Sequence, residues 1–193
     1  MRRRSLAVWQ SRRVDERRYY AFLRAINTGN RRLTNEQLLA PFHALGFTDP
    51  AAYQAAGNVT FCSADSAAVD EQRIEAALAE SYGFESATFV RTADEIESIV
   101  RTERFTEGDL ARTAGKVQVA FLRSAPSPGT IAQVMELAPP EDRVVVSGRE
   151  WYWLPVGGVS TSTLPGSQVG SLLGEMTMRT LGTLTRMHAR FGP

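Results

Sequence analysis

The first half of the chain contains predicted strands and helices in an order that few folds accept. Short apolar segments bounded by turn residues predict strands, and two segments with apolar residues at helical spacing predict helices. In chain order they are Tyr19–Arg24, Thr34–Gly46, Tyr53–Ala55, Val59–Phe61, Ser66–Tyr82 and Ala87–Arg91. This β-α-β-β-α-β order predicts a ferredoxin-like unit, an antiparallel sheet covered by helices on one face, and the fold class α+β.

The second half of the chain starts the same order again. The predicted strands and helices are Val117–Leu122, Ser127–Leu137, Arg143–Val146, Glu150–Leu154, Gln168–Leu173 and Thr180–Arg190. These elements predict an incomplete second copy of the first unit, packed against it. The predicted organisation is a basic arm at residues 1–18, a first half at 19–105, a polar linker at 106–115 and a second half at 116–193.

Several segments match a known family pattern in order and spacing. They read LRAINTGNRRLTNEQLL at Leu23–Leu39, ALGF at Ala44–Phe47, YQAAGNVTF at Tyr53–Phe61, FVRTADEI at Phe89–Ile96 and TMRTLGTLTRM at Thr177–Met187. Together they resemble the DUF 1697 family, a bacterial domain of unknown function, over about residues 19–190. The resemblance implies kinship and fold, and it implies no activity because none is established for that family.

The chain departs from the family pattern at several polar positions. Ala25 and Asn30 stand where relatives usually have glycine, and Ala56 replaces a serine. The family's Asn-Trp-Asn becomes Thr180-Leu181-Gly182 near the C-terminus. The chain is therefore a divergent member, and an ancestral activity carried by those side chains would be lost or altered. Recruitment to a specialised metabolic pathway would account for such changes.

Positive charge is concentrated at the N-terminus. Residues 1–18 hold seven arginines against two acids, a net charge of +5. The whole chain carries +1, so residues 19–193 sum to −4. An arginine-rich arm can reach a phosphate backbone or an anionic surface, and it can equally be a solvated tail. Nucleic acid, if bound, would therefore be bound through residues 1–18 only.

The composition excludes several common chemistries. Cys62 is the single cysteine, so no intrachain disulfide can form and a cytoplasmic location is expected. His43 and His188 have no partner at metal-ligand spacing, and no Walker, G-x-G-x-x-G or G-x-S-x-G motif is present. We expect no metal and no cofactor. No apolar run is long enough to cross a bilayer, so no membrane association is expected.

Candidate binding residues lie where the family motifs fall at predicted turns. They are Arg24, Asn27, Gly29, Asn30, Asn58, Arg179 and Thr183. Asparagine and glycine at turns can serve only to adopt positive φ angles. Arginine has no such role. Arg24 after an apolar strand and Arg179 at the start of the last predicted helix would each need acceptors if buried. These acceptors would be internal groups or a bound anion.

Two tryptophans share one face of a predicted strand. Period-two alternation places Trp151 and Trp153 on one side and Tyr152 on the other. Paired tryptophans of this kind usually belong to a core or to an interface between halves. They could instead form the apolar wall of a ligand pocket.

Two functions from different classes remain open. The first is binding of a small anionic or partly apolar molecule between the two halves. If the protein is an enzyme, a shape-driven isomerase or cyclase is the class that the residues exclude least. The alternative is a nucleic-acid or protein-partner binding module that uses the arginine-rich arm. A structural or dimerising role is a third possibility, and the sequence sets no oligomeric state.

Overall fold

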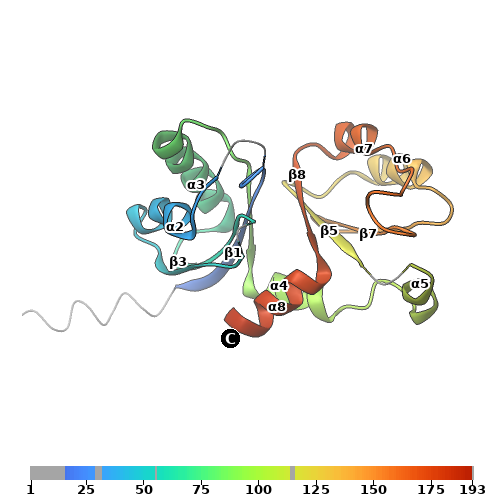
Figure 1. Cartoon of the computed structure of the whole chain (residues 1–193), viewed down its shortest axis with the longest axis horizontal. Coiled ribbons are helices and arrows are strands. Elements are labelled where there is room, and N and C mark those ends of the chain that lie inside the picture. The colour runs from blue at the N-terminus through green and yellow to red at the C-terminus, as the bar shows by residue number, and fades with distance from the viewer. Residues whose placement is uncertain (1–15, 29–31, 55, 114–115, 193) are drawn as a thin grey trace, which may run out of the picture.

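The computed structural model describes residues 16–28, 32–54, 56–113 and 116–192. Within these ranges the chain forms two four-stranded antiparallel sheets, each with helices on its outer face (Figure 1). The predicted α+β class is therefore confirmed. Most of the predicted basic arm lies outside the described residues. Its last residues, Arg17 and Arg18, already belong to strand β1.

The first unit has the predicted order of elements. Its sheet has the strand order β2-β3-β1-β4. The helices begin at side-chain caps, since Thr34 and Ser66 each accept a hydrogen bond from a backbone N–H in the first turn. Gly83 ends the second helix with a φ of 67°, a left-handed conformation that glycine adopts without strain. The elements are β1 (Arg17–Leu23), α2 (Asn35–Ala44), β2 (Thr48–Ala52), β3 (Asn58–Ser63), α3 (Ala67–Tyr82) and β4 (Thr88–Thr92).

The second unit repeats this order completely. Its strand order, β6-β7-β5-β8, matches that of the first unit position by position. Strand β8 was not predicted, so the second copy has all six elements rather than an incomplete set. Arg179 consequently lies in β8 and does not open the last helix. The elements are β5 (Gln118–Leu122), α6 (Pro128–Leu137), β6 (Arg143–Ser147), β7 (Glu150–Leu154), α7 (Gly166–Leu173) and β8 (Met176–Thr180).

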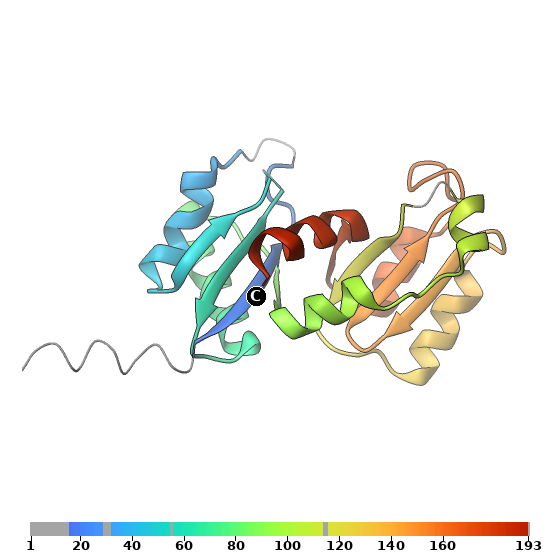
Figure 2. The same cartoon turned by 90° about the horizontal axis from the view of Figure 1, so that it is seen from below.

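Within the described ranges, three further helices lie outside the two repeats. Helix α4 (Ala93–Arg101) follows β4, and α8 (Leu181–Phe191) follows β8. These two helices pack side by side beneath the sheets (Figures 1 and 2). Helix α5 (Glu107–Arg112) occupies most of the predicted linker 106–115 and begins at a capping box made by Thr106 and Asp109.

One predicted hairpin strand was wrong in position. Strand β2 is Thr48–Ala52, whereas the prediction was Tyr53–Ala55. The pattern misled because β2 contains Pro50 and lacks strongly apolar alternation. It is an edge strand, where a missing N–H is tolerated. Tyr53 follows the strand, and its backbone N–H donates to the Asn58 carbonyl oxygen at 2.8 Å.

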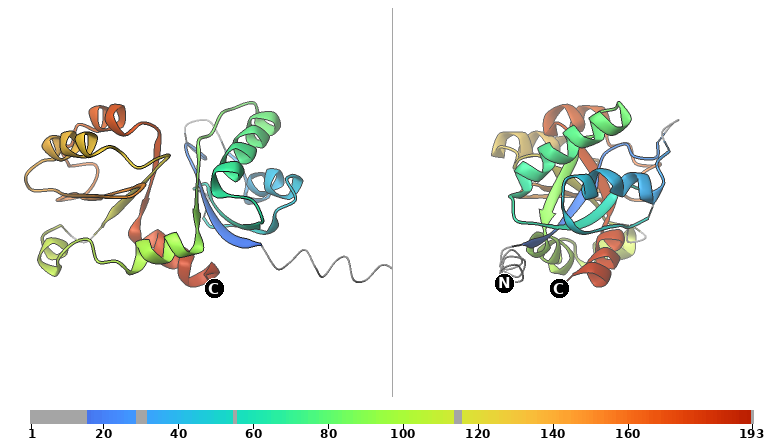
Figure 3. Two further views of the ribbon diagram at one scale, coloured as in Figure 1. Left: turned by 180° about the vertical axis from the view of Figure 1, so that it is seen from behind. Right: turned by 90° about the vertical axis from the view of Figure 1, so that its left-hand side faces the viewer.

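Alternating side chains divide each strand between two hydrophobic layers. In β1, Tyr19, Ala21 and Leu23 face α2 and α3, while Tyr20 and Phe22 face the second unit. The same alternation in the second unit produces a helix-covered core and an inward face. Figure 3 shows from behind that the two inward faces oppose each other. The third layer, between the sheets, is the interface at which side chains from both halves meet.

Candidate functional site

Arg179 crosses from the second unit into the first. Its Nη2 donates to the carbonyl oxygens of Leu23 and Ala56, both at 2.9 Å, and to that of Gly57 at 3.4 Å. Its Nε donates to the Asn58 side-chain oxygen. The acceptors come from the end of β1 and from the turn before β3. We call these five residues the Arg179 clamp.

The charge of Arg179 is held by neutral groups. Its Nη1 donates to the Thr177 hydroxyl and the Met178 carbonyl oxygen, both at 2.8 Å, so every guanidinium nitrogen has an internal acceptor. No carboxylate of the described residues forms an ion pair with it. Burial without a compensating acid lowers the pKa of Arg179 to about 10. The side chain is therefore still a cation at neutral pH, with no donor left over for an anion.

Arg91 forms a second clamp in the opposite direction. It is fully buried, and its Nε donates to a Glu150 carboxylate oxygen at 2.6 Å. Its Nη2 donates to the carbonyl oxygens of Leu122 and Arg149, at 2.9 and 3.1 Å, and its Nη1 donates to that of Val90 at 3.0 Å. Burial lowers the pKa of Arg91, and the Glu150 carboxylate opposes this shift. We call these residues the Arg91 clamp.

The two clamps lie at equivalent positions of the two units. Arg91 and Arg179 are each the fourth residue of a five-residue strand. Phe22 and Phe121 stack between them with ring centroids 4.1 Å apart and planes inclined by 7°. The Arg91 guanidinium lies 5.3 Å from the Phe121 ring centroid, and that of Arg179 lies 5.9 Å from Phe22. The two units thus meet through equivalent residues.

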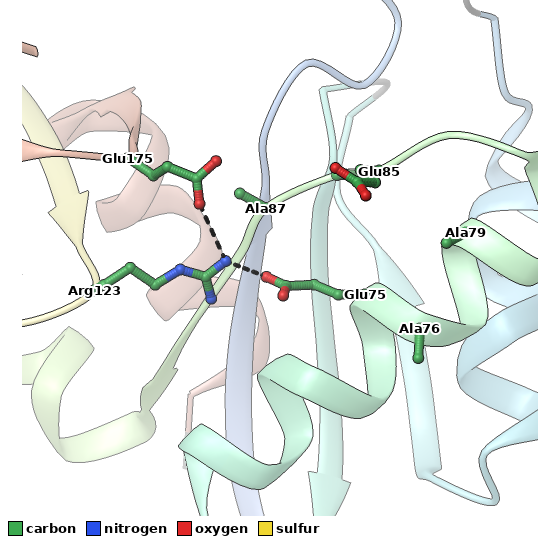
Figure 4. A pocket seen from close by; sticks show the side chains of 8 residues that line it. Glu75, Ala76, Ala79, Glu85, Ala87, Arg123 and Glu175 are labelled. Carbon is green, nitrogen blue, oxygen red and sulfur yellow. Dashed lines mark hydrogen bonds and ion pairs between the residues drawn. The ribbon is translucent and has the colours of Figure 1, made fainter.

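A cavity of about 280 Å³ opens beside this interface (Figure 4). Arg123 lies in it between Glu75 of α3 and Glu175 at the start of β8. It also donates to the Thr88 carbonyl oxygen at 2.9 Å and lies 3.5 Å from a Glu71 carboxylate oxygen. Burial would lower the pKa of Arg123, but the carboxylates outweigh it and the pKa is raised. The central cation of this cavity is thus already neutralised.

Arg24 lies beside the same cavity, next to its lining residue Glu175. Its guanidinium lies 3.7 Å from Glu175, and more than half of its side chain is exposed. Its backbone is bonded on both sides, since its N–H donates to the Ala87 carbonyl oxygen and its own carbonyl oxygen accepts from the Ser86 hydroxyl. Ion pairs between such exposed side chains contribute little free energy. Arg24 is therefore an exposed residue beside the cavity and not a buried anion ligand.

A second pocket lies between residues 99–110 and the inward face of the second sheet. Its volume is about 190 Å³. We call it the Tyr152 pocket. The chain forms its walls from the end of α4, the segment leading to α5, the approach to β5, and the start of α8. Its apolar lining consists of Ile99, Val100, Phe105, Leu110, Val117 and Leu181.

Two polar groups line the Tyr152 pocket without a hydrogen bond of standard distance and angle to any described residue, although they lie close to each other. Tyr152 is 1% exposed, and its buried hydroxyl forms no such bond. The buried Nε of Arg104 forms none either, and its guanidinium lies 5.0 Å from the Tyr152 ring centroid. Burial raises the pKa of Tyr152, and the Arg104 side chain partly opposes this rise, first by hydrogen bonding toward the Tyr152 hydroxyl and then by its positive charge. Buried polar groups are normally satisfied, so these two require an explanation.

The other predicted site residues have structural roles. Asn27 has a φ of 58°, and its side chain bonds both the N–H and the carbonyl oxygen of Leu33, which closes the loop. Gly29 and Asn30 lie outside the described residues. The Thr183 N–H donates to the Thr180 hydroxyl at 3.1 Å, which caps α8. Among the described candidates, the structure brings Asn58 into direct contact with Arg179 and Trp151 into contact with Trp153, and Arg24 lies near the first of these pairs.

The two tryptophans face away from the interface. Trp151 and Trp153 stack with ring centroids 5.8 Å apart in the core beneath α6 and α7. The Trp153 indole N–H donates to an Asp142 carboxylate oxygen at 2.9 Å. Because of the alternation along β7, Tyr152 between them points the other way, into the interface layer. The tryptophans thus belong to the core of the second unit.

In the ranges that the structure describes, no group of three or more histidine, cysteine, aspartate or glutamate residues could hold a metal ion. No helix within those ranges is long and apolar enough to traverse a bilayer.

Comparison with known proteins places the chain in a family. The family model described as "Protein of unknown function (DUF1697)" matches residues 17–152. The chain belongs to this family. The matched range contains the whole first unit and ends at Tyr152 in β7, before the segment Thr177–Met187 that also resembles the family pattern.

A solved structure shares the fold. It is that of the conserved bacterial protein SP0830 from Streptococcus pneumoniae, with a TM-score of 0.68 and 20% sequence identity. The match covers 90% of this chain and 98% of that chain. No curated protein matches the chain. These findings support the two-unit α+β architecture and leave the site to be argued from its chemistry.

Sequence reasoning missed the residues that line the Tyr152 pocket. The alternation in Glu150–Leu154 does separate Tyr152 from the tryptophans, which was the available signal. No sequence pattern pointed to Arg104, because it lies between two helices in a segment without periodicity. Arg91 was missed because it sits within an otherwise apolar strand, where its carbonyl partners belong to distant segments.

Proposed function

We propose that this protein binds a small, partly apolar molecule in the Tyr152 pocket, at the junction of its two halves. The observation that carries the proposal is the buried hydroxyl of Tyr152, which lines an apolar pocket and forms no hydrogen bond of standard distance and angle with the described residues. A bound molecule with an acceptor at that point would satisfy the hydroxyl. The walls would supply the hydrophobic contact.

The remaining polar clusters support this choice by contrast. The guanidinium nitrogens of Arg179 all have internal acceptors, and Arg123 is neutralised by Glu75 and its neighbours. A ligand entering either place would have to replace existing hydrogen bonds. A ligand in the Tyr152 pocket would meet a hydroxyl and a guanidinium Nε that form no hydrogen bond of standard geometry, so binding there would replace fewer existing hydrogen bonds.

The alternative function rests on the arginine-rich arm. It is binding of nucleic acid or of a protein partner through this arm, most of which, residues 1–15, lies outside the described residues. An isomerising or cyclising reaction, if the protein catalyses one, would use the Tyr152 pocket. That pocket offers shape and one phenol in place of an acid–base pair.

The test is a screen of small aromatic and branched aliphatic compounds against the full chain by ligand-observed NMR, with affinities from titration. We expect hits that bind wild-type protein and bind Tyr152→Phe about fivefold more weakly, since one hydrogen bond contributes about 1 kcal/mol. Tyr20→Phe is the matched control. It removes another buried, unpartnered phenol of the interface layer, and Tyr20 does not line the pocket.

A second variant tests the location independently of the hydroxyl. Val100→Phe adds volume to the wall of the pocket and should abolish binding of the same hits, while circular dichroism verifies folding. Hits whose affinity is the same in wild type, Tyr152→Phe and Val100→Phe would place binding elsewhere and overturn the proposal. The absence of any hit for the wild-type protein would also overturn it.

A further inference from the structure

We infer that the ligand of the Tyr152 pocket is a small monocarboxylate with a compact apolar body, held at its carboxylate by Arg104 and Tyr152. This inference rests on the proposed function and specifies its ligand class. It starts from the two unpaired polar groups, which differ in what they can offer. A guanidinium only donates hydrogen bonds, whereas a phenol can donate or accept.

The Arg104 guanidinium is the part of the pocket that selects charge. Its Nε is buried without a partner, and no carboxylate of the described residues forms an ion pair with it. Its guanidinium lies over the Tyr152 ring, 5.0 Å from the centroid, so both groups reach the same part of the pocket. A carboxylate has two acceptor oxygens. One can accept from Arg104 and the other from Tyr152.

The other charged residues of the lining favour a single negative charge. Arg101 lies 2.9 Å from Glu97, so its charge is already paired. Glu103 and Glu107 line the pocket as exposed residues and add negative charge at its rim. A phosphate dianion would meet these carboxylates with one free guanidinium to balance two charges. A monocarboxylate needs only one.

The size of the pocket limits the apolar body. Its volume is about 190 Å³. A cavity of roughly 150 Å³ lined by apolar side chains accepts a molecule the size of benzene. The pocket therefore has room for one ring or one branched aliphatic chain together with a carboxylate. The side chains of Val100, Phe105 and Leu110 would contact that body.

The experiment uses probes that differ in charge but are similar in shape. The pairs are benzoate with benzyl alcohol, and 3-methylbutanoate with 3-methylbutan-1-ol, titrated by NMR against the full chain. We expect each carboxylate to bind at least tenfold more tightly than its alcohol. In Arg104→Gln this preference should fall to less than threefold, because carboxylate affinity drops while alcohol affinity is unchanged.

The control removes a neighbouring positive charge outside the pocket. Arg112 lies on α5, is more than half exposed, and pairs with Asp109. Arg112→Gln should keep the full preference for carboxylates. An unchanged preference in Arg104→Gln, or an equal loss in Arg112→Gln, would overturn the inference.

The two proposals fail in different ways. Alcohols that bind the wild-type protein as tightly as the carboxylates, with Tyr152→Phe still weakening both, would overturn the monocarboxylate and leave the proposed function standing. If neither member of either pair binds the wild-type protein, and the broader screen gives no hit, the proposed function itself fails and the inference fails with it.

Discussion

The two arginine clamps occupy equivalent places but neutralise their charge differently. Arg91 meets the Glu150 carboxylate, whereas Arg179 meets the neutral amide oxygen of Asn58. Both also donate to carbonyl oxygens at the end of the central strand of the other unit, Leu122 for Arg91 and Leu23 for Arg179. The shared part of the geometry is therefore the carbonyl acceptors, and the acid is present in only one copy.

This difference shows which contact the junction requires. A guanidinium between two sheets can be held by carbonyl oxygens and one amide, at the cost of a pKa lowered to about 10 in Arg179. Full burial is found for the arginine that has a carboxylate partner, Arg91 at 0% exposed. Arg179, without one, is only partly buried. The carbonyl acceptors, which both clamps share, thus define how the units pack.

The largest effect should come from removing Arg91. Arg91→Ala leaves the Glu150 carboxylate, which is 13% exposed, without its partner and opens carbonyl acceptors inside the interface. Breaking a buried pair in this way costs about 3–5 kcal/mol of the free energy of unfolding. Urea denaturation followed by tryptophan fluorescence would measure it. A loss below 1 kcal/mol would show that the Arg91 clamp does not hold the units together.

A conservative variant separates charge from hydrogen bonding in that clamp. Glu150→Gln keeps an acceptor for Arg91 Nε and makes the clamp resemble the one at Arg179. The expected loss is about 1–2 kcal/mol, since a hydrogen bond to a charged group exceeds a neutral one by roughly that amount. A loss as large as that of Arg91→Ala would mean that the carbonyl acceptors contribute nothing.

Removing Arg179 should have a smaller effect. Arg179→Ala leaves the Asn58 oxygen and the carbonyl oxygens of Leu23 and Ala56 without this donor, but no charge is stranded. Ala56 is exposed, so water can reach part of the clamp. We expect a loss of about 1–3 kcal/mol in the same denaturation experiment. A loss larger than that of Arg91→Ala would reverse the comparison.

The smallest effect at neutral pH should come from giving the second clamp an acid. Asn58→Asp supplies a carboxylate to Arg179 but loses the hydrogen bond that Asn58 Nδ2 donates to the Tyr53 carbonyl oxygen at 3.1 Å. These changes oppose each other, so stability at pH 7 should change by about 1 kcal/mol or less.

The pH dependence of that variant is the sharper test. Arg179 should depress the pKa of the introduced carboxylate below its unfolded value of about 3.9. Its stabilising contribution is then present above the unfolded pKa and lost as pH falls through the folded pKa. Between pH 6 and 3, Asn58→Asp should lose about 1–2 kcal/mol relative to wild type. Parallel stability curves would show that the guanidinium and carboxylate do not interact.

Local patterns predicted most elements of the fold. The boundaries of β7 were predicted as found, Glu150–Leu154, and the caps Thr34, Ser66 and Ser127 mark where helices begin. These signals succeed because capping and strand alternation depend on residues only a few positions apart. The order of elements then restricts the possible sheets. Strands β1 and β5 are largely apolar and contain no proline, and they occupy inner positions of their sheets.

Strand β8 shows where local patterns stop being informative. Its sequence, Met-Thr-Met-Arg-Thr, lacks the continuous apolar character of β5, and only Thr177 is buried. It is a strand because Thr177, Met178 and Arg179 pair with β5. Pairing energy comes from a partner more than fifty residues away, so no short window reveals it. The prediction therefore placed Arg179 at a helix start.

The sequence by itself determined the α+β class, the repeated order of elements and which side chains share a face of each strand. These properties follow from spacings of two and of about 3.6 residues, which are written in consecutive positions. The tertiary structure alone decided which faces meet. Arg179 and Asn58 lie 121 residues apart, and Tyr152 meets the 99–110 segment only because the two sheets pack face to face. A pocket and its unpaired donors are products of that packing, so no single segment encodes them.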